Sequence, residues 1–348
     1  MNARVGIGLI GCGTIASAVH ARVLNRLRGA RLVAIADPSA SARDTARRLA
    51  PGAEICAEHA EVLARPDVEA VVLCAPTPLH ADLALEVLAA DKHLYLEKPI
   101  ATNEADGERV VDAARRAPVL TVVGFNRRFH PLFEQARVAV GDGAVGTVHA
   151  VSTAFCEPVG AQAMPDWKTT RANGGGVLLD LASHHVDLVR WLLADELESV
   201  EASIRSEITE QDAADLRGTL RGGATVTGFF SFRAARADFL ALIGDRGVLR
   251  VDRYDASLAV WVARPGLAAV RRRPVRPSRA LLEWRLQRLV RPASEPSYGR
   301  SLAAFVDTLR GNAQELPTME DGLRSLEAIL AAERSAGLAA ATAVVAIA

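Results

Sequence analysis

The sequence lacks net charge and any paired arrangement of cysteines. In its 348 residues, 41 lysines and arginines balance 41 aspartates and glutamates. No global electric field therefore draws the chain toward nucleic acid or an anionic membrane. The four cysteines, at positions 12, 56, 74 and 156, show neither the spacing of a zinc site nor that of a redox dithiol. We expect a cytoplasmic protein with reduced thiols, no metal site and no nucleic-acid partner.

Long apolar segments are also absent. Four glycines interrupt the apolar stretch at residues 5–16, and Arg4 is the only charged residue before it, which does not fit a secretion signal. The apolar tail at residues 336–348 is shorter than the roughly 20 residues that a helix needs to span a bilayer. The sequence therefore predicts that the protein has no membrane partner.

The first part of the chain has the pattern of an α/β fold. Half of all residues are apolar, and the length favours two domains because single cores seldom exceed roughly 250 to 300 residues. Short β-branched runs alternate with segments of helical period, which is typical of parallel strands joined by crossover helices. The expected strands are 5–10, 31–37, 70–74, 93–97 and 120–124, and the expected helices include 79–90 and 105–117. This pattern predicts a doubly wound Rossmann domain over residues 1–124.

The order of elements changes beyond Pro131. We expect a helix, a strand near 148–155, a long loop and a helix at 177–193. Strands then follow in quick succession, at 200–205, 215–220, 224–232, 239–244, 248–251 and 258–262, and two helices at 302–310 and 323–336 close the chain. The pattern predicts an α+β domain with an open, mainly antiparallel sheet over residues 125–348.

A glycine-rich turn after the first expected strand has the pattern of a dinucleotide site, made of Gly11, Gly13, Thr14, Ile15 and Ala16. Gly11 permits a tight turn, and Gly13 lets the backbone approach a pyrophosphate whose charge the helix N-terminus then meets. Asp37 ends the second strand, where it would bind the adenosine ribose and repel the extra phosphate of NADP. The motif favours NAD, with NADP possible, and FAD or S-adenosylmethionine sites would share this unit.

The tripeptide Glu97-Lys98-Pro99 follows directly after a buried strand. It falls at the carboxyl edge of the sheet, where open α/β folds bind their ligands. The adjacent proline holds Lys98 more rigidly than most surface lysines are held. We favour a functional role for Lys98 over that of an ordinary surface lysine.

A second set of ionisable residues lies on the helix expected after the glycine run at 174–176. Asp180, His184 and Asp187 fall on one helical face, beside a mostly apolar stripe that should pack inward. This spacing predicts a polar stripe at a boundary or cleft. Taken alone, His184 is better explained as a histidine held by one of these aspartates for structural reasons.

The combination of motifs resembles the glucose-fructose oxidoreductase, inositol dehydrogenase and MocA (Gfo/Idh/MocA) family of sugar dehydrogenases. The resemblance covers nearly the whole chain. It rests on residues 11–16, Ala75-Pro76-Thr77-Pro78-Leu79-His80, Glu97-Lys98-Pro99, Gly124-Phe125-Asn126-Arg127-Arg128-Phe129, and residues 174–187. It implies a nucleotide-binding domain followed by a domain whose open sheet often serves oligomer assembly, here a homodimer or homotetramer, with substrate bound between the domains.

The resemblance also implies roles for individual residues. It makes Lys98, Asp180 and His184 catalytic. The residues expected at the cofactor, beyond the glycine turn and Asp37, are Cys74, Pro76, Thr77, His80, Glu97, Lys98 and Asn126, and those expected at the substrate are Lys98, Arg128, Trp167, Asp180 and His184. The chain departs from the family pattern at Ala182, where glycine is common, and at Lys168, where arginine is common. The second departure puts the substrate rather than the chemistry in doubt.

These observations predict an NAD(P)-dependent oxidoreductase that transfers a hydride between nicotinamide and a secondary alcohol or ketone of a sugar, cyclitol or nucleotide sugar. His184 would take the hydroxyl proton, because the ordinary histidine pKa of about 6.5 suits that exchange. Lys98 would hydrogen-bond the same oxygen, and Asp180 would hold the substrate or tune the histidine. The alternatives are a redox-neutral enzyme that retains NAD, such as a glycosidase-like or sugar–sugar oxidoreductase, and a dinucleotide-sensing regulator.

The segment 264–300 is strongly basic, with ten arginines against Glu283 and Glu295. Arginine forks match phosphate oxygens, so the segment fits the diphosphate of a nucleotide sugar. A solvated insertion or an oligomer contact arm fits better, because runs of charge usually face solvent. Without interleaved aromatic residues, the segment does not indicate nucleic-acid binding.

Overall fold

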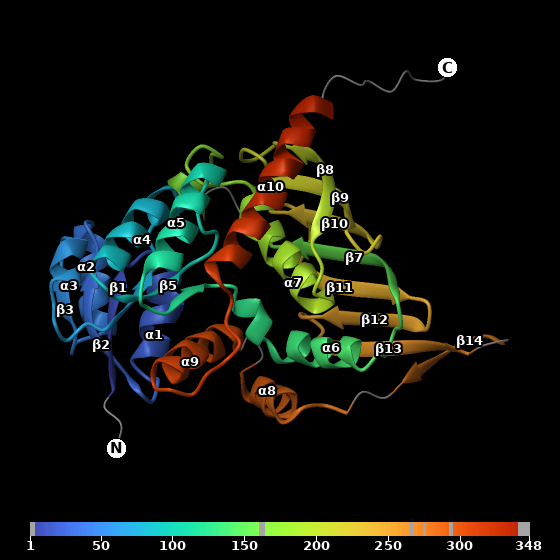
Figure 1. The fold of residues 1–348 in the computed structure, drawn as a ribbon, viewed down its shortest axis with the longest axis horizontal. Coiled ribbons are helices and arrows are strands. Elements are labelled where there is room, and N and C mark those ends of the chain that lie inside the picture. Colours follow the sequence, from blue (N-terminus) through green and yellow to red (C-terminus); the bar gives the residue numbers. More distant parts are fainter. Residues whose placement is uncertain (1–3, 160–163, 265–266, 274–275, 292–294, 340–348) are drawn as a thin grey trace. The chain divides into compact units, whose positions relative to one another are not determined.

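The computed structural model describes residues 4–159, 164–264, 267–273, 276–291 and 295–339 (Figure 1). The chain divides into two compact units. One comprises Met1–Phe129 and Glu295–Leu326, and the other comprises His130–Ser294 and Glu327–Ala348. The first unit is therefore discontinuous in sequence, because the chain returns to it near its end. The boundary predicted at residue 124 does not include this return.

The first unit contains a six-stranded parallel sheet. Its strands are β1 (Val5–Ile10), β2 (Ala30–Ala36), β3 (Glu54–Cys56), β4 (Ala70–Leu73), β5 (His93–Leu96) and β6 (Thr121–Val123), in the spatial order β3-β2-β1-β4-β5-β6. This is the order of dinucleotide-binding folds, so the predicted Rossmann fold is confirmed. Only the three-residue edge strand β3 was not predicted.

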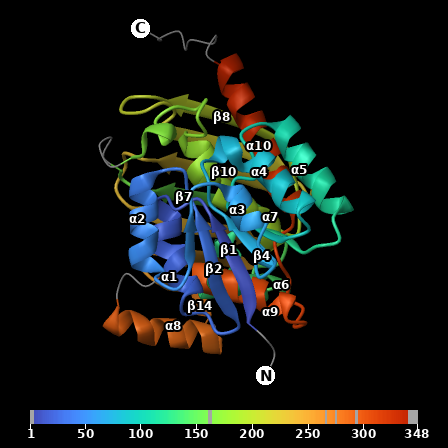
Figure 2. The same cartoon turned by 90° about the vertical axis from the view of Figure 1, so that its left-hand side faces the viewer.

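Helices cover both faces of this sheet. They are η1 (Ala16–His20), α1 (Ala21–Leu24), α2 (Ala40–Leu49), α3 (His59–Leu63), η2 (Thr77–Leu79), α4 (His80–Ala89), α5 (Glu104–Arg116), η3 (Asn126–Phe129) and α9 (Ser297–Leu309). Figure 2 shows α1 and α2 on one side of the strands and α3, α4 and α5 on the other. All six residues of β1 are buried, as a strand covered on both faces requires.

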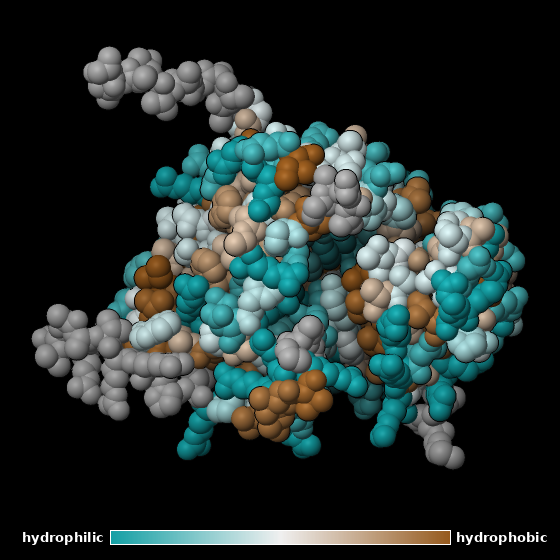
Figure 3. Space-filling model, turned by 180° about the vertical axis from the view of Figure 1, so that it is seen from behind, coloured by the Kyte–Doolittle hydropathy of each residue, from teal (hydrophilic) through white to brown (hydrophobic). Residues whose placement is uncertain are grey.

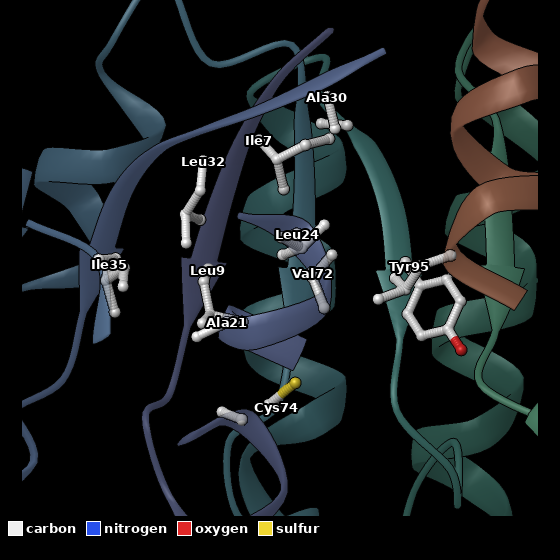
Figure 4. Close-up of a cluster of buried hydrophobic side chains, with 14 of the residues drawn as sticks. Ile7, Leu9, Ala21, Leu24, Ala30, Leu32, Ile35, Val72, Cys74 and Tyr95 are labelled. Carbon is white, nitrogen blue, oxygen red and sulfur yellow. The ribbon is translucent and has the colours of Figure 1, made fainter. Parts of the chain in front are cut away.

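The core on the α1 side joins distant parts of the sequence. Figure 4 shows the centre of this core. Strand β1 contributes Ile7 and Leu9, helix α1 contributes Leu24, and strands β4 and β5 contribute Val72 and Tyr95. Helix α9 adds three fully buried side chains to the same cluster, namely Leu302, Phe305 and Val306. The C-terminal return of the chain therefore completes the core of the first unit.

The second unit contains an eight-stranded sheet in the order β14-β13-β12-β11-β7-β10-β9-β8. Its strands are β7 (Val148–Cys156), β8 (Leu197–Arg205), β9 (Ala213–Leu220), β10 (Thr225–Ser231), β11 (Ala237–Gly244), β12 (Gly247–Asp252), β13 (Ser257–Arg264) and β14 (Leu267–Arg273). Strands β7 and β10 pair in parallel, and the other neighbours are antiparallel. The predicted open, mainly antiparallel sheet is thus confirmed.

The helical elements of the second unit are α6 (Pro131–Gly141), η5 (Asp166–Lys168), η6 (Leu178–Ala182), α7 (Ser183–Leu193) and α8 (Arg279–Val290). Helices α6 and α7 contact strands of the sheet. Helix α10 (Met319–Ala339) begins in the first unit and ends in the second. Within the described ranges, no helix is both long enough and apolar enough to cross a membrane.

Strand β5, between α4 and α5, contains a histidine that we expect to make the stability of the fold depend on pH. His93 of β5 accepts a hydrogen bond at Nδ1 from the backbone amide of Leu120, 2.9 Å away, so its ring is held unprotonated at that atom. Burial lowers the pKa of His93 below its ordinary value, against the opposing charge of Glu69. The folded state then binds fewer protons than the unfolded state below about pH 6.5, the ordinary histidine pKa.

We therefore expect the melting temperature to fall as the pH is lowered from 7.5 through this range. His93→Asn supplies an amide oxygen in place of Nδ1 and cannot titrate. Thermal unfolding of this variant should show a weaker dependence on pH than the wild-type protein over the same interval. Parallel curves for the two proteins would show that His93 does not contribute.

Candidate active site

The turn between β1 and the first helix has the backbone geometry expected of the predicted phosphate-binding turn. Gly11 has a φ of +85°, and a Cβ atom there would lie 2.8 Å from backbone atoms of Cys74 and Ala75 at the end of β4. Only glycine fits this position. Gly13 and Thr14 are exposed and begin a helix whose first amide groups have no helical carbonyl to bind. Such a helix start attracts phosphate.

Two further residues of the motif have distinct positions. Ile15 packs against the core of the unit. Asp37 lies beside the turn, where its carboxylate accepts hydrogen bonds from the amides of Cys12 at 2.7 Å and Ser39 at 2.8 Å. These bonds fix the carboxylate next to the glycine turn. Each carboxylate oxygen has a second lone pair, so it can still accept a ribose hydroxyl.

The loop after β4 contains Cys74, Pro76 and Thr77. The side chains of Cys74 and Thr77 are buried, and Pro76 is partly exposed at the start of η2. Burial, with the negative charge of Glu97, raises the pKa of the Cys74 thiol well above its ordinary value. Cys74 is therefore a neutral thiol at the sheet edge rather than a nucleophile.

His80 connects this loop to the turn after Lys98. It is buried, with Nδ1 2.7 Å from the carbonyl oxygen of Pro99 and Nε2 2.8 Å from that of Ala75. Burial lowers the pKa of His80, although both carbonyls act in the opposite direction. The imidazole is thus engaged within the protein, and its predicted contact with a cofactor stays a prediction.

Lys98 begins the turn at the carboxyl end of β5 and is partly exposed. Glu97, immediately before it, is buried with its Oε1 2.6 Å from Nε2 of His20. Its second oxygen, Oε2, accepts a hydrogen bond from the backbone amide of Lys98 at 3.2 Å. The peptide bond between Lys98 and Pro99 is cis. The backbone at Lys98 is therefore held in place by the buried carboxylate of Glu97.

Asn126, at the start of η3, has one end of its amide occupied. Its Nδ2 donates to the hydroxyl of Ser297 on α9 at 2.7 Å. Its Oδ1 is buried and has no hydrogen-bond partner among the described residues. A buried acceptor without a partner costs about 1–3 kcal/mol. The Oδ1 acceptor of Asn126 is thus open to a hydrogen bond from a bound group, and its predicted contact with a cofactor stays a prediction.

Arg128 is held by a neighbour that the sequence did not indicate. Its guanidinium lies 3.1 Å from both carboxylate oxygens of Asp321, at the start of α10, and 5.9 Å from the ring centre of Phe125. The side chain is only 8% exposed. This bidentate pair fixes the guanidinium within the first unit. The predicted contact of Arg128 with nicotinamide or substrate stays a prediction.

In the second unit, Asp180 and His184 lie where an irregular helix becomes regular. Residues 178–182 form a turn of π-helix, and α7 follows directly. Asp180 is partly exposed, whereas His184 is 7% exposed and lies edge-on to Phe155 with 6.2 Å between ring centres. Asp187 is 1% exposed, as deep as the leucine beside it. The predicted apolar stripe is buried as expected, whereas the predicted polar boundary stripe fails at Asp187, which is buried as well.

Trp167 and Lys168, on η5, lie beside Asp180. The ammonium of Lys168 is 2.9 Å from Oδ2 of Asp180 and 5.4 Å from the centre of the Trp167 ring. The structure thus brings these three predicted residues together. A carboxylate, an ammonium and an indole face are a set that can bind hydroxyl groups and the apolar face of a sugar ring.

The candidate residues are divided between the two units. Lys98 and Asn126 belong to the first unit, and Asp180 and His184 belong to the second. The sequence did not indicate His20, Ser297 or Asp321. His20 lies only four residues beyond the glycine motif, so its position on the nucleotide-binding helix was the available signal. Ser297 and Asp321 come from the C-terminal return, and no local pattern marks them.

The chain matches two models of protein families, "Oxidoreductase family, NAD-binding Rossmann fold" over residues 5–125 and "GFO/IDH/MocA C-terminal domain" over residues 133–250. It is 37% identical over 200 residues to inositol 2-dehydrogenase of Gluconacetobacter diazotrophicus, a match that spans 57% of each chain. It is 30% identical over 345 residues to inositol 2-dehydrogenase of Rhizobium meliloti, which covers 95% of this chain and 96% of the relative.

A solved structure agrees over nearly the whole length. The oxidoreductase domain protein from Kribbella flavida is 25% identical to this chain, with a TM-score of 0.84, and the alignment covers 97% of this chain and 98% of the other. Both family models fall on the units seen here, one on the parallel sheet and the other on the mixed sheet. The chain therefore belongs to the Gfo/Idh/MocA family of oxidoreductases.

Proposed function

We propose that this protein is an NAD-dependent dehydrogenase that transfers a hydride between nicotinamide and a secondary alcohol or ketone of a sugar or cyclitol. The observation that carries the proposal is the first unit's arrangement of a phosphate-binding turn, a fixed Asp37 and Lys98 at the edge of one sheet. The buried acceptor of Asn126 fits a nicotinamide carboxamide. Inositol dehydrogenases among the relatives support a polyol substrate.

In this mechanism residues of the chain accept the proton of the substrate hydroxyl and stabilise the negative charge that develops on its oxygen. His184 takes the proton of the substrate hydroxyl in the oxidative direction. Lys98 donates a hydrogen bond to the same oxygen and stabilises its negative charge. Asp180, oriented by Lys168, holds a neighbouring hydroxyl. The glycine turn, Asp37 and Asn126 would hold the dinucleotide, whose nicotinamide would supply the hydride acceptor in oxidation and the hydride donor in reduction.

The decisive experiment is a titration of the purified protein with NADH and NADPH, followed by absorbance at the nicotinamide band with a panel of inositols, sugars and nucleotide sugars. We expect tight NADH binding and turnover on at least one polyol. Binding without net formation of NADH would instead support a redox-neutral enzyme or a sensor. Absence of binding to either dinucleotide would contradict the proposal.

The preference for NAD over NADP rests on Asp37. Its carboxylate is fixed by two backbone amides, and Nη1 of Arg43 is engaged by the carbonyl oxygens of Asp37 and Pro38. A 2′-phosphate would therefore meet a negative charge.

We expect Asp37→Ser to weaken NADH binding by about 10- to 100-fold, because a hydrogen bond to a charged group contributes about 1.5–3 kcal/mol. NADPH binding should improve or stay unchanged, so the ratio of the two dissociation constants shifts toward NADPH. Asp44→Ser, on the exposed side of α2, is the matched control and should leave the ratio as it is. An unchanged ratio in Asp37→Ser would rule out Asp37 as the selecting residue.

The role of His184 is tested by pH. His184→Asn should lower turnover by about 10²- to 10⁴-fold, the usual contribution of a general base, and should abolish the rise of kcat toward a high-pH plateau. His149→Asn, at an exposed position of β7 in the same unit, is the control for loss of a histidine. A pH profile of His184→Asn with the wild-type shape would show that another group titrates.

We further propose that the protein is a homodimer or homotetramer. Alternate residues of the second unit's strands, such as Thr225, Thr227 and Ile243, are exposed. Helix α8 adds exposed apolar side chains, Leu282, Leu286, Leu289 and Val290, seen as the brown cluster low in Figure 3. The exposed apolar side chains of α8, together with Ile243, favour self-association. Light scattering should give a multiple of the 37.0 kDa chain mass, and a single-chain mass would contradict the proposal.

The predicted cytoplasmic location stays a prediction.

A further inference from the structure

His20 is a buried polar residue that the proposed mechanism does not use. Its side chain is fully buried, and its Nε2 lies 2.6 Å from Oε1 of Glu97. Its Nδ1 is also buried and has no hydrogen-bond partner among the described residues. A proton at Nδ1 would leave a donor unsatisfied, whereas a proton at Nε2 is donated to the carboxylate. The contact therefore fixes the tautomer, with Nε2–H donating to Glu97.

The ring of His20 has little freedom to turn away. It lies edge-on to Tyr95, with 6.0 Å between ring centres, and edge-on to Tyr298 of α9 at 5.8 Å. Burial and the charge of Glu97 raise the pKa of Tyr95 well above its ordinary value, so that neighbour stays neutral. Two aromatic walls and one hydrogen bond thus define the position of the imidazole.

The carboxylate of Glu97 is equally confined. Its Oε1 accepts from His20, and its Oε2 accepts from the backbone amide of Lys98 at 3.2 Å. Gly124 closes the remaining side, since a Cβ atom there would lie 3.1 Å from Oε2. Both oxygens are therefore engaged within the protein, and the Glu97 side chain is only 8% exposed, unlike the partly exposed Asp37. This arrangement favours an indirect role for Glu97 over the direct cofactor contact predicted from the sequence.

The hydrogen bond between His20 and Glu97 links two regions that are far apart in the sequence. His20 ends the π-helical turn Ala16–His20, which follows the glycine turn where the dinucleotide phosphate would bind. Glu97 follows β5 and precedes Lys98. One buried hydrogen bond therefore joins the phosphate-binding turn to the base of the candidate catalytic lysine. Turns of π-helix occur frequently at functional sites.

We propose that His20 is a positioning residue for Lys98, acting through the carboxylate of Glu97, so that the dinucleotide turn and the lysine keep a fixed relation. The inference rests on the proposed role of Lys98 as the residue that touches the substrate oxygen. Without the Nε2–H donor, Glu97 turns and the backbone of Lys98 loses its acceptor. The lysine then samples positions from which it cannot reach the reacting atom.

The composition of the chain provides a direct probe of this relation. It contains three lysines, Lys92, Lys98 and Lys168. Reductive methylation with [¹³C]formaldehyde therefore gives three lysine signals in an NMR spectrum, and single Lys→Arg variants assign them. The probe reports on Lys98 whether or not a substrate has been identified.

We compare His20→Leu, which removes the donor, with His20→Gln, whose amide nitrogen can reach the position of Nε2. In His20→Leu the Lys98 signal should move or broaden and should lose the change that NADH causes in the wild-type protein. Lys92 and Lys168 should keep their signals, which shows that the fold is intact. His20→Gln should restore the wild-type Lys98 signal. A Lys98 signal in His20→Leu that coincides with the wild type, with and without NADH, would overturn the proposal.

Turnover provides a second, independent readout. His20→Leu should lower kcat by about 10- to 100-fold, the loss expected from a misplaced catalytic group, with KM and NADH affinity nearly unchanged. In a Lys98→Met background the same substitution should have no further effect, because residues that act as one unit are not additive. Additive losses would show that His20 acts on the fold alone. Absence of wild-type turnover would instead refute the proposed function, and the NMR comparison would still decide the role of His20.

Discussion

Replacing Lys98 by methionine is expected to lower kcat by about 10³-fold, because the substitution removes a donor aimed at the developing alkoxide. Methionine keeps most of the apolar stem, and the backbone amide of residue 98 still bonds to Glu97. NADH affinity should therefore stay within a few-fold. Initial rates at saturating NAD give kcat, and quenching of tryptophan fluorescence gives the dissociation constant.

Lys92→Met is the matched control for this experiment. Lys92 lies just before β5 in the same unit, and its ammonium donates to the carbonyl oxygen of Arg65. This variant loses the same charge and should keep full turnover. If Lys98→Met also turns over at the wild-type rate, Lys98 is not the residue that stabilises the substrate oxygen.

Gly11→Ala is expected to have the second largest effect, on both folding and cofactor binding. An alanine at a φ of +85° is strained by about 1–3 kcal/mol, and its Cβ would lie 2.8 Å from backbone atoms at the end of β4. The turn must shift to relieve this contact. We expect the free energy of unfolding to fall by about 2 kcal/mol or more and NADH binding to become undetectable at concentrations that saturate the wild type.

Gly52→Ala separates this effect from the general cost of replacing glycine. A Cβ atom at Gly52 meets no atom within 4 Å. Urea unfolding and NADH titration should both match the wild-type protein for this variant. Wild-type stability and affinity in Gly11→Ala would mean that the turn tolerates a side chain, and the phosphate site would then have to lie elsewhere.

The repeating parts of this fold follow from local pattern. Each central strand of the first unit is a short apolar run, because a strand covered on both faces has no polar side to display. The run at residues 5–10 is one such case, and β1 has these bounds. The glycine turn was predictable because the spacing of Gly11, Gly13 and Ala16 directly after an apolar run is itself a local pattern. Strand β3 was missed because a three-residue edge strand is too short for a periodic signal.

The residues that orient the candidate site residues could not be predicted from local sequence patterns. Asn126 is oriented by Ser297, which lies 171 positions away in sequence, and Arg128 is held by Asp321, 193 positions away. Such contacts exist only after the chain has returned to the first unit. The π-helical turn at 178–182 also escaped prediction, because an assumed period of 3.6 residues placed Asp180 and Asp187 on one polar stripe at a boundary or cleft. Burial of Asp187 within the second unit overrode that pattern.

Because α9 returns to the first unit, the core of that unit is completed only late in synthesis. Domains generally fold as they leave the ribosome, and synthesis adds about 5–20 residues per second. Here the dinucleotide-binding sheet is synthesised first, yet Leu302, Phe305 and Val306 of its core emerge about 180 residues later than Phe129, a delay of roughly 10 to 40 s at those rates. During that interval the apolar surface that α9 will cover is exposed. A ribosome that pauses before α9 therefore presents chaperones with a complete sheet and an unfinished core.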